Sequence, residues 1–427
     1  MPPTNAADTA WLLVATALVL MMTPALGFFY GGMVRAKNAL NTLMMSFSAL
    51  GFVGLAWALL GYSFAFGSTP LAHAFLRGVT LDLKGTIPHL LFFGYQGTFA
   101  IITAALISGA IVERMRFGPY VAFITIWSLV VYAPLAHWVW GGGWLARLGA
   151  LDFAGGTVVH VNAAAAAIVC ALVVGSRKDY ARQAILPQNV PFTLLGAGLL
   201  WLGWFGFNAG SALAANRTAA LAFVNTMLAP TATLVVWTLL DLVRTSKATA
   251  IGAATGIVVG LVAITPAAGF VSPISAILIG AIAAVPSYYA LLFRARTRLD
   301  DSLDVVAAHG VGGVVGAMLT GVFAQPAWSG VDSTGALFGN IRQLGVQAIA
   351  ILATIVYSGV LTFAILKAIA LAARLRTDIR EEGLGLDFTQ HGEEAYSRGE
   401  GAILLLDGGS RKAAEPQGLK EEAVANA

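Results

Sequence analysis

The chain has 427 residues, of which 58% are hydrophobic and 11% are charged, and its mean hydropathy is +0.79. So little polar surface excludes a soluble globule of this size and predicts an integral membrane protein. Repeated apolar windows of about 20 residues indicate membrane-spanning helices rather than barrel strands, because a helix satisfies its own backbone groups in lipid. The net charge of +4 does not indicate a nucleic-acid partner, since the basic residues lie in short loops between apolar segments.

Apolar runs broken by charges or by Gly and Pro clusters predict eleven spans and an all-α fold. The first five cover approximately Ala10 to Gly32, Thr42 to Phe66, His89 to Val112, Tyr120 to Trp138 and Thr157 to Gly175. The next five cover approximately Pro191 to Ser211, Thr218 to Leu240, Thr249 to Ile264, Ser272 to Phe293 and Val305 to Phe323. The last, from about Ile341 to Ala373, is long enough to tilt or to project beyond the bilayer.

The loops between these spans differ in charge. One alternate set holds about twelve basic residues by the positive-inside count, among them Arg177 and Arg294, and the opposite set holds about five. The first set is therefore predicted to be cytoplasmic, with the N-terminus outside and the C-terminus inside. No cleavable signal peptide is evident, because the first basic residue, Arg35, follows the first apolar segment.

The composition changes after the last span. We therefore divide the chain into a transmembrane domain, residues 1–373, and a cytosolic segment, residues 374–427, that is too short and polar for an independent enzymatic domain. A docking segment or a disordered tail are the two interpretations of this part.

The lone Cys170 excludes an internal disulfide and is predicted to lie in the core.

Spans one to five and six to ten form a candidate inverted repeat, followed by the long final helix. Asp152 precedes His160 at the outer entry of the fifth span, and Asp304 precedes His309 at the inner entry of the tenth. At 1.5 Å per residue the histidines lie roughly 12 Å and roughly 7.5 Å beyond these acids. The core is roughly 30 Å thick, so the imidazoles meet only if both acids lie below the membrane surface.

The two histidines are costly in lipid and so indicate function. His160 alone is equally consistent with an ordinary interhelical hydrogen bond. The pair, however, can form a polar strip through an apolar duct, which would pass a small hydrogen-bonding molecule or relay protons. Asp152 suits the N-cap of the fifth span, and it can also favour cations near the entrance.

Aromatic residues gather near the outer ends of several spans. Trp204 suits an interfacial belt, whereas Phe207, with Ser211 one turn on, suits a lined vestibule. Trp140 stands beside three glycines and can offer its face to a small ammonium-like cation, although anchoring at the lipid interface is the usual role of Trp here. Phe99 lies in a similar cluster in the third span.

Metal, hydrolytic and nucleotide sites are not indicated. The sequence has no HExxH motif and no Gly-x-Ser-x-Gly elbow, and its Gly-rich pieces follow no strand. An intramembrane enzyme using Asp152, His160 and His309 would need a metal such as zinc. We therefore expect no enzymatic activity, no resident metal and no cofactor.

Six motifs in this order resemble the ammonium transporter (Amt/MEP/Rh) family, and the external Trp favours its bacterial Amt branch. They are QGTFAIITAALISGAIVERMRF at Gln96, HWVWGGGWL at His137, DFAGGTVVH at Asp152, GWFGFNAGSA at Gly203, ITPAAGFV at Ile264 and DDSLDVVAAHGVGG at Asp300. The resemblance covers about Asp8 to about Tyr396. One departure is Asn162-Ala163-Ala164, where members often have Ser or Asn followed by Ala-Gly.

The resemblance implies roles for particular side chains. Trp140, Phe99 and Ser211 match the external ammonium-recruiting site, with Asp152 as its supporting acid. Phe99 and Phe207 match the stacked phenyl gate beneath that site. His160 and His309 match the twin histidines of the pore.

The resemblance also implies how the protein works and with what it assembles. It implies uptake of ammonium, with methylammonium as an analogue, across the bacterial inner membrane by a homotrimer in which each subunit has its own pore. Ammonium would lose its proton outside, pass as ammonia and be reprotonated inside. The segment from Asp378 to Glu393 resembles the family's tail, which implies coupling between subunits and a PII-type signal protein as partner. An ammonium sensor that signals through this segment is the alternative.

Overall fold

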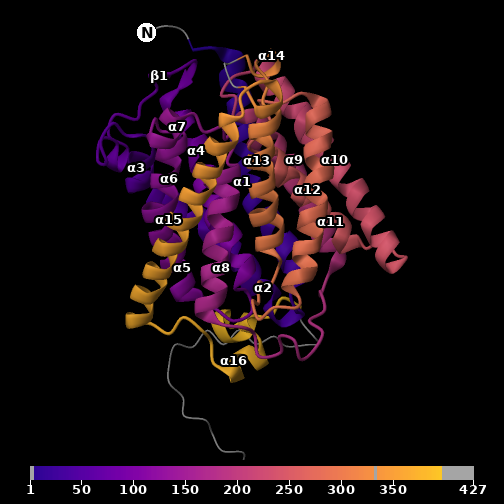
Figure 1. Ribbon diagram of the computed structural model, residues 1–427. Coiled ribbons are helices and arrows are strands. Elements are labelled where there is room, and N and C mark those ends of the chain that lie inside the picture. The colour runs from indigo at the N-terminus through magenta and orange to yellow at the C-terminus, as the bar shows by residue number, and fades with distance from the viewer. Residues whose placement is uncertain (1–3, 331–333, 397–427) are drawn as a thin grey trace, which may run out of the picture.

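The structure is a computed structural model that describes residues 4–330 and 334–396, an all-helical bundle with a small hairpin at one end (Figure 1). Ten segments of this described part are long and apolar enough to cross a membrane, and the apolar helix α11 (Ala250–Ile264) is shorter, with 15 residues. The predicted all-α membrane class is therefore confirmed. The segment after about Arg398 lies outside the described residues.

The ten long segments comprise five single helices and five that contain 3₁₀ or π turns. They are α1 (Ala6–Met33); α2 (Ala39–Ala56) with η2 (Trp57–Gly61) and α3 (Tyr62–Phe66); α4 (His89–Leu106) with η4 (Ile107–Ala110); α5 (Phe117–Trp127) with η5 (Ser128–Tyr132), α6 (Ala133–Val139) and α7 (Trp144–Leu148); η6 (Gly156–Val161) with α8 (Asn162–Val174); α9 (Val190–Gly210); α10 (Arg217–Thr245); α12 (Pro273–Arg294); η7 (Val306–Val311) with α13 (Gly312–Phe323); and α15 (Arg342–Ala372).

Short elements occupy the connections. They are η1 (Ala36–Asn38), η3 (Ala74–Leu76), β1 (Leu83–Lys84), β2 (Ile87–Pro88), α14 (Pro326–Ser329), η8 (Ala336–Phe338), α16 (Ile379–Leu384) and η9 (Asp387–His391). The strands β1 and β2 pair antiparallel. We call the end of the bundle where α1 begins the N-terminal end, and the opposite end, which carries α16, the basic end (Figure 1).

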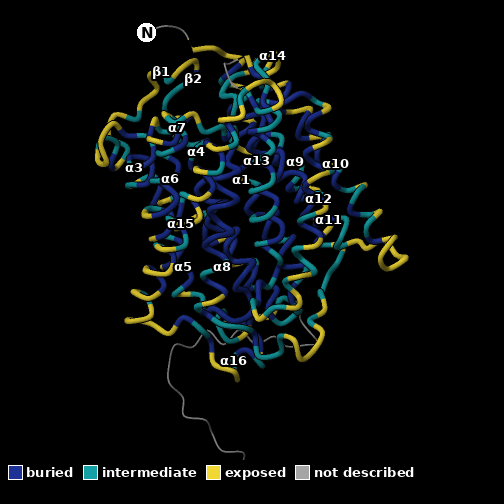
Figure 2. Tube along the Cα trace, viewed as in Figure 1, coloured by how far each residue is buried: buried dark blue, intermediate teal, exposed yellow. Residues whose placement is uncertain are grey.

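Burial follows the expectation for a membrane bundle. Buried residues fill the centre, and exposed ones gather at the two ends and on outward helix faces (Figure 2). Those outward faces are apolar: Val243 of α10 is 87% exposed and Val360 of α15 is 62% exposed. Exposure of such apolar surfaces to water is unfavourable, whereas contact with lipid or with another apolar subunit is not. Cys170 is buried in the core, as predicted.

Helices α1 and α9 form a tight antiparallel seam. Gly206 shows why: a Cβ atom there would lie 2.7 Å from Cβ of Leu18 and 2.8 Å from the backbone oxygen of Ala15. Gly196, nearer the start of α9, meets Phe29, nearer the end of α1, so the helices run in opposite directions. Close backbone approach at small residues is the usual way in which helices associate within lipid. The first spans of the two predicted halves therefore pack together along their length.

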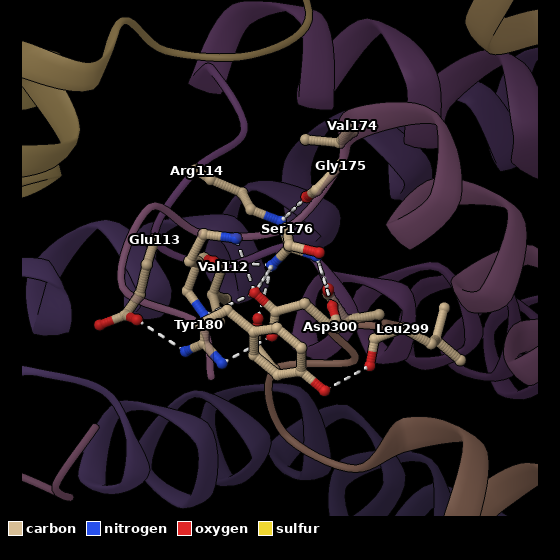
Figure 3. Close-up of polar contacts among 12 residues, drawn as sticks. Val112, Glu113, Arg114, Val174, Gly175, Ser176, Tyr180, Leu299 and Asp300 are labelled. Carbon is tan, nitrogen blue, oxygen red and sulfur yellow. Dashed lines mark hydrogen bonds and ion pairs between the residues drawn. The ribbon is translucent and has the colours of Figure 1, made fainter. Parts of the chain in front are cut away.

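A buried charge network ties the loops of the basic end together (Figure 3). Glu113 accepts from Nε of Arg35 at 3.0 Å and from Nη1 of Arg177 at 2.7 Å. Arg177 also binds Asp300 at 2.7 Å, and Arg114 donates to backbone oxygens, including that of Gly175. Four segments distant in the sequence thus share one network.

The network shifts the pKa values of its acids. Burial alone would raise the pKa of Glu113, but Arg177 and Arg35 lower it below the usual range. Burial alone would likewise raise the pKa of Asp300, but Arg177 and Arg114 lower it below the usual range. Both carboxylates are therefore ionised at neutral pH, which keeps the buried arginines paired.

The C-terminal segment docks against this end of the bundle. The carboxylate of Asp387 accepts from the backbone N–H groups of Leu40 and Asn41, at 3.1 and 2.7 Å, and so caps the start of α2. Glu382 is buried and pairs with Arg376 at 2.9 Å. Part of this segment, residues 376–391, is therefore ordered against the bundle, whereas its docking to a partner stays a prediction.

Replacing Glu113 by Gln should destabilise the protein by about 3 kcal/mol, because it leaves Arg35 and Arg177 without their shared carboxylate. The lowered pKa of Glu113 also makes the stability of the protein depend on pH. The stabilisation by ionised Glu113 is complete above the ordinary Glu pKa of about 4.3, and it is lost as the pH falls through the lower pKa of the folded state. The melting temperature of the wild type should thus fall more steeply below about pH 4 than that of E113Q. Asp82→Asn, on an exposed loop, is the control; equal melting of E113Q and D82N would contradict this assignment.

Candidate functional site

Asp152 caps the start of the span that carries His160. Its carboxylate accepts from the backbone N–H groups of Gly155 (2.8 Å), Gly156 (2.6 Å) and Thr157 (2.8 Å), and from the Thr157 hydroxyl. Gly155 has a φ of 118°, which glycine adopts readily and other residues rarely do. Asp152 thus caps the helix start, as predicted, but from three residues before the N-cap position, which Gly155 occupies, and these donors occupy both carboxylate oxygens.

Asp301 has the corresponding place before His309. Its Oδ2 accepts from the backbone N–H of Val306, five residues later, at 2.7 Å. His309 follows eight residues after Asp301. Thr157 and His160 stand at the same two spacings after Asp152. Asp304, which the sequence analysis paired with His309, forms an ion pair with Arg294 instead. The positional analogy to Asp304 was wrong, because the cap and not the nearest acid marks where the buried helix starts.

Asp301 also differs from Asp152 in its partners. Among the described residues its Oδ1 is buried without a hydrogen-bond partner. Burial, and then the neighbouring carboxylate of Asp304, raise the pKa of Asp301 to about 7. Near neutral pH this acid therefore exists in both protonation states.

The two predicted pore histidines meet inside the bundle. Nδ1 of His160 lies 3.2 Å from Nδ1 of His309, and both side chains are nearly inaccessible. Both residues lie in π-helical turns, η6 and η7, a feature that is frequent at functional sites. Of the two acids on which the predicted contact depended, Asp152 is buried, whereas Asp304 is partly exposed and the buried Asp301 takes its place before His309. One ring must donate and the other accept, so the pair shares a single proton along this bond.

The two phenyl rings lie directly beside this pair. Phe99 and Phe207 stack with their centroids 4.2 Å apart and an interplanar angle of 22°. Phe207 is 6.1 Å from the ring of His160, and Trp140 meets the other side of Phe99 at 6.0 Å, edge to face. The order of rings is therefore Trp140, the Phe pair, then the histidines.

Trp140 and Ser211 are partly exposed at the N-terminal end of this row. Nε1 of Trp140 donates to the backbone oxygen of Asp152 at 2.9 Å, so Asp152 fixes the indole through its main chain. The Ser211 hydroxyl donates to the oxygen of Phe207 at 2.8 Å and lies 3.3 Å from the hydroxyl of Tyr95. The predicted site residues are thus brought together.

Trp204 is not at the membrane interface. It is 2% exposed, its ring stacks on His160 at 5.4 Å, and its Nε1 donates to the Thr265 hydroxyl at 2.9 Å. The prediction of an interfacial belt residue was wrong, because α9 turns this side chain into the bundle. Trp204 walls the histidine pair instead.

Two cavities adjoin the histidines. One, of about 10 Å³, is lined by apolar side chains together with His160 and His309 and has Phe207 in its wall. A volume of this order holds about one water-sized molecule. The other, of about 340 Å³, is also lined by His309 and reaches Arg244 and Asp304 near the basic end.

The small cavity is lined by a buried group that is able to bind a small molecule. Nε2 of His160 has no hydrogen-bond partner among the described residues. The groups present therefore suit a small neutral molecule that can donate or accept one hydrogen bond. No cluster of three potential metal ligands occurs in the described part of the chain.

The ammonium transporter family model matches residues 10–396. The chain belongs to the ammonium transporter family. It is 49% identical over 400 residues to an ammonium transporter of Aquifex aeolicus, covering 91% of this chain and 93% of the relative. It is 45% identical over 398 residues to that of Bacillus subtilis, covering 91% and 98%.

Solved structures agree with this family membership. The crystal structure of Candida albicans Mep2 matches with a TM-score of 0.84 and 38% identity, covering 92% of this chain and 90% of that one. A structure described as a sensor Amt protein matches with a TM-score of 0.84 and 30% identity, covering 90% and 98%. The helical architecture of this ammonium transporter family member is thus found in both.

Sequence reasoning missed three contributors to this family member's site. Tyr95 was quoted in a motif without a role, yet its hydroxyl donates to the oxygens of Gly206 and Phe207 at 2.9 and 3.0 Å and holds the end of α9. Asp301 could have been found from its spacing of eight residues to His309. The stacking of Trp204 left no signal in the spacing that we used.

Asp152→Asn separates the cap from a purely electrostatic role. The amide keeps one acceptor but turns an NH₂ group towards donors, so we expect a loss of about 2 kcal/mol of stability. The measurement is the melting temperature of the purified protein beside its ammonium flux in liposomes.

Loss of flux with an unchanged melting temperature would contradict the cap as the main role of Asp152. Thr80→Ala, which removes a hydroxyl partner of the exposed Asp82, provides a control with little expected effect.

Proposed function

We propose that this protein carries ammonium across the plasma membrane as neutral ammonia. The observation that carries the proposal is the contact between His160 and His309 in an apolar cavity beside the stacked Phe99 and Phe207. Membership of the ammonium transporter family supports ammonium as the substrate. The basic end is the cytosolic face, by the positive-inside count of its loops.

Ammonium is first held at the outer aromatic site. Trp140 and Phe99 offer ring faces, which attract a small cation without demanding that carboxylates replace all of its water. Ser211 supplies a hydroxyl oxygen. Asp152 supports the site by its charge and by fixing Trp140, and does not bind the cation directly because its carboxylate is already occupied.

Ammonium gives its proton to the external water before it enters the duct. A bare cation entering a cavity with almost no polar wall would lose its hydration for little in return, whereas neutral ammonia loses far less. Ammonia passes the phenyl gate, hydrogen-bonds to His160 and His309, and enters the wider cavity, where it regains a proton. Potassium has no proton to lose, so the same duct excludes it.

Assembly and regulation follow from the resemblance to the family. We propose a homotrimer with a pore in each subunit, eleven spans with α11 among them, and residues 1–373 as the conducting domain. The C-terminal segment from residue 374 onward would meet a PII-type protein at the cytosolic face. The apolar outward faces of α10 and α15 suit lipid or a neighbouring subunit.

An ammonium sensor is the second candidate, favoured by the match to a structure described as a sensor Amt protein. Binding of ammonium without flux would support a sensor, and flux would support the transporter. A role as an enzyme is not proposed, since the relatives are named as transporters.

Replacing both His160 and His309 by Leu should reduce ammonium flux at least tenfold or admit potassium, because the duct loses its hydrogen-bonding groups. Proteoliposomes would be compared for currents and internal pH changes with ammonium, methylammonium and potassium. His73→Leu removes a histidine from a loop outside the duct and is the matched control. Unchanged flux and selectivity in the double variant would remove the proposed role, and no flux in the wild type would refute transport.

Phe207→Ala tests the gate. Removing the ring opens space between the outer site and the histidines, and we expect potassium or water leakage to rise at least several-fold while ammonium selectivity falls. Stopped-flow swelling of proteoliposomes measures the water leak. Phe205→Ala, which removes a stacked ring of the same helix paired with Phe223, controls for loss of an aromatic pair. Equal leaks in both variants would argue against a gate at Phe207.

A further inference from the structure

A second large cavity lies at the basic end, separate from the duct. It measures about 1010 Å³ and is walled by three stretches of chain that are far apart in the sequence. We call it the basic cavity; its lining residues are Ser176 to Gln183, Thr297, Arg298 and Arg376 to Ile379. Its size suits a ligand the size of a nucleotide or a lipid headgroup.

The cations around the basic cavity fall into two groups. Arg177 is committed to Glu113 and Asp300, and Arg376 to Glu382. In contrast, the charged groups of Lys178, Arg182 and Arg298 have no ion pair or hydrogen bond among the described residues. Lys178, Arg182 and Arg298 are therefore the cations that remain available to a ligand.

The acids of the cavity do not neutralise these three. Asp179 pairs with Arg35 at 2.7 Å, and Asp378 lies 3.7 Å from both Arg116 and Arg374. Each lining carboxylate thus already has a cationic partner. The cavity carries uncompensated positive charge.

The walls are held together before any ligand binds. The Ser176 hydroxyl donates to the backbone oxygen of Arg298 at 3.1 Å, and the Tyr180 hydroxyl to that of Leu299 at 3.0 Å (Figure 3). The backbone N–H of Lys178 donates to Glu382, which joins the same loop to the C-terminal segment. A site fixed in this way orders few groups on binding, which favours affinity.

We propose that the basic cavity binds a phosphate-bearing anion through Lys178, Arg182 and Arg298. Guanidinium groups match the oxygens of a phosphate in pairs, and an ammonium adds a compact charge. The positive-inside rule accounts for basic loops at this face, but not for three cations that line one walled cavity and have no partner among the described residues. The phosphate comes either from a soluble polyphosphate or from the headgroup of an anionic lipid.

Occupancy would affect the docked segment. Residues Arg376 to Ile379 form one wall, and the loops before α9 and after α12 form the others, so a bound anion clamps the segment to the bundle. This proposal does not depend on transport, because the duct shares no lining residue with the basic cavity.

The test measures binding to the full-length protein in nanodiscs of neutral lipid at about 0.15 M salt. Pyrophosphate is titrated by calorimetry as the soluble probe; in a second arm, nanodiscs containing phosphatidic acid are analysed for retained lipid by native mass spectrometry. We expect saturable binding in at least one arm, weakened at least tenfold in R182Q/R298Q. The arm that responds identifies the source of the phosphate.

The matched control is R296Q/R380Q, which removes the same charge from two exposed residues that do not line the basic cavity. Binding by this variant should stay within about threefold of the wild type, since the general field of the surface falls equally in both variants. Equal weakening in the two variants would overturn the site, and so would the absence of binding to the wild type in both arms.

Discussion

The buried start of a helix is the constraint on which this protein depends. The first N–H groups of a helix have no partner within it, and lipid offers none. Asp152 and Asp301 supply carboxylate oxygens to such starts from opposite directions. Each cap lets a helix begin inside the protein with a histidine eight residues on. The meeting of His160 and His309 is thus a consequence of two caps of equal spacing.

Asp152 shows how a charge can lie close to the proposed duct. A carboxylate whose oxygens already accept hydrogen bonds from backbone N–H groups is fixed in place and has little remaining capacity to bind a passing cation. Asp152 therefore affects the entrance through geometry as much as through charge, by holding Trp140. The duct itself remains apolar apart from the imidazoles. In the proposed mechanism, positioning and conduction are done by different groups.

The sequence sufficed for much of the fold and of the site. Long apolar runs predicted the spans because the lipid core imposes their length, and the histidines stood out because they are costly there. Phe99, Phe207, Trp140 and Ser211 were singled out from motifs, and the structure brings them into one row with the histidines.

What the sequence left open depended on side-chain direction and on long-range pairing. Trp204 was expected at an interface because a Trp near a span end usually lies there, but its direction depends on how α9 packs. Glu113 and Arg177 were counted only as loop charges, since their pairing joins segments 64 residues apart. Asp304 was chosen over Asp301 because distance along the chain says nothing about which carboxylate meets the free N–H groups.

The seam between α1 and α9 has a mechanical consequence. Transporters that alternate between two openings rock one half of the molecule against the other. Here the first helices of the two predicted halves touch through backbone atoms at Gly196 and Gly206, so at these contacts no side chain lies between them that could yield as one helix slides. Such a seam favours a static frame in which rotations of individual rings, and not of half the protein, admit each molecule.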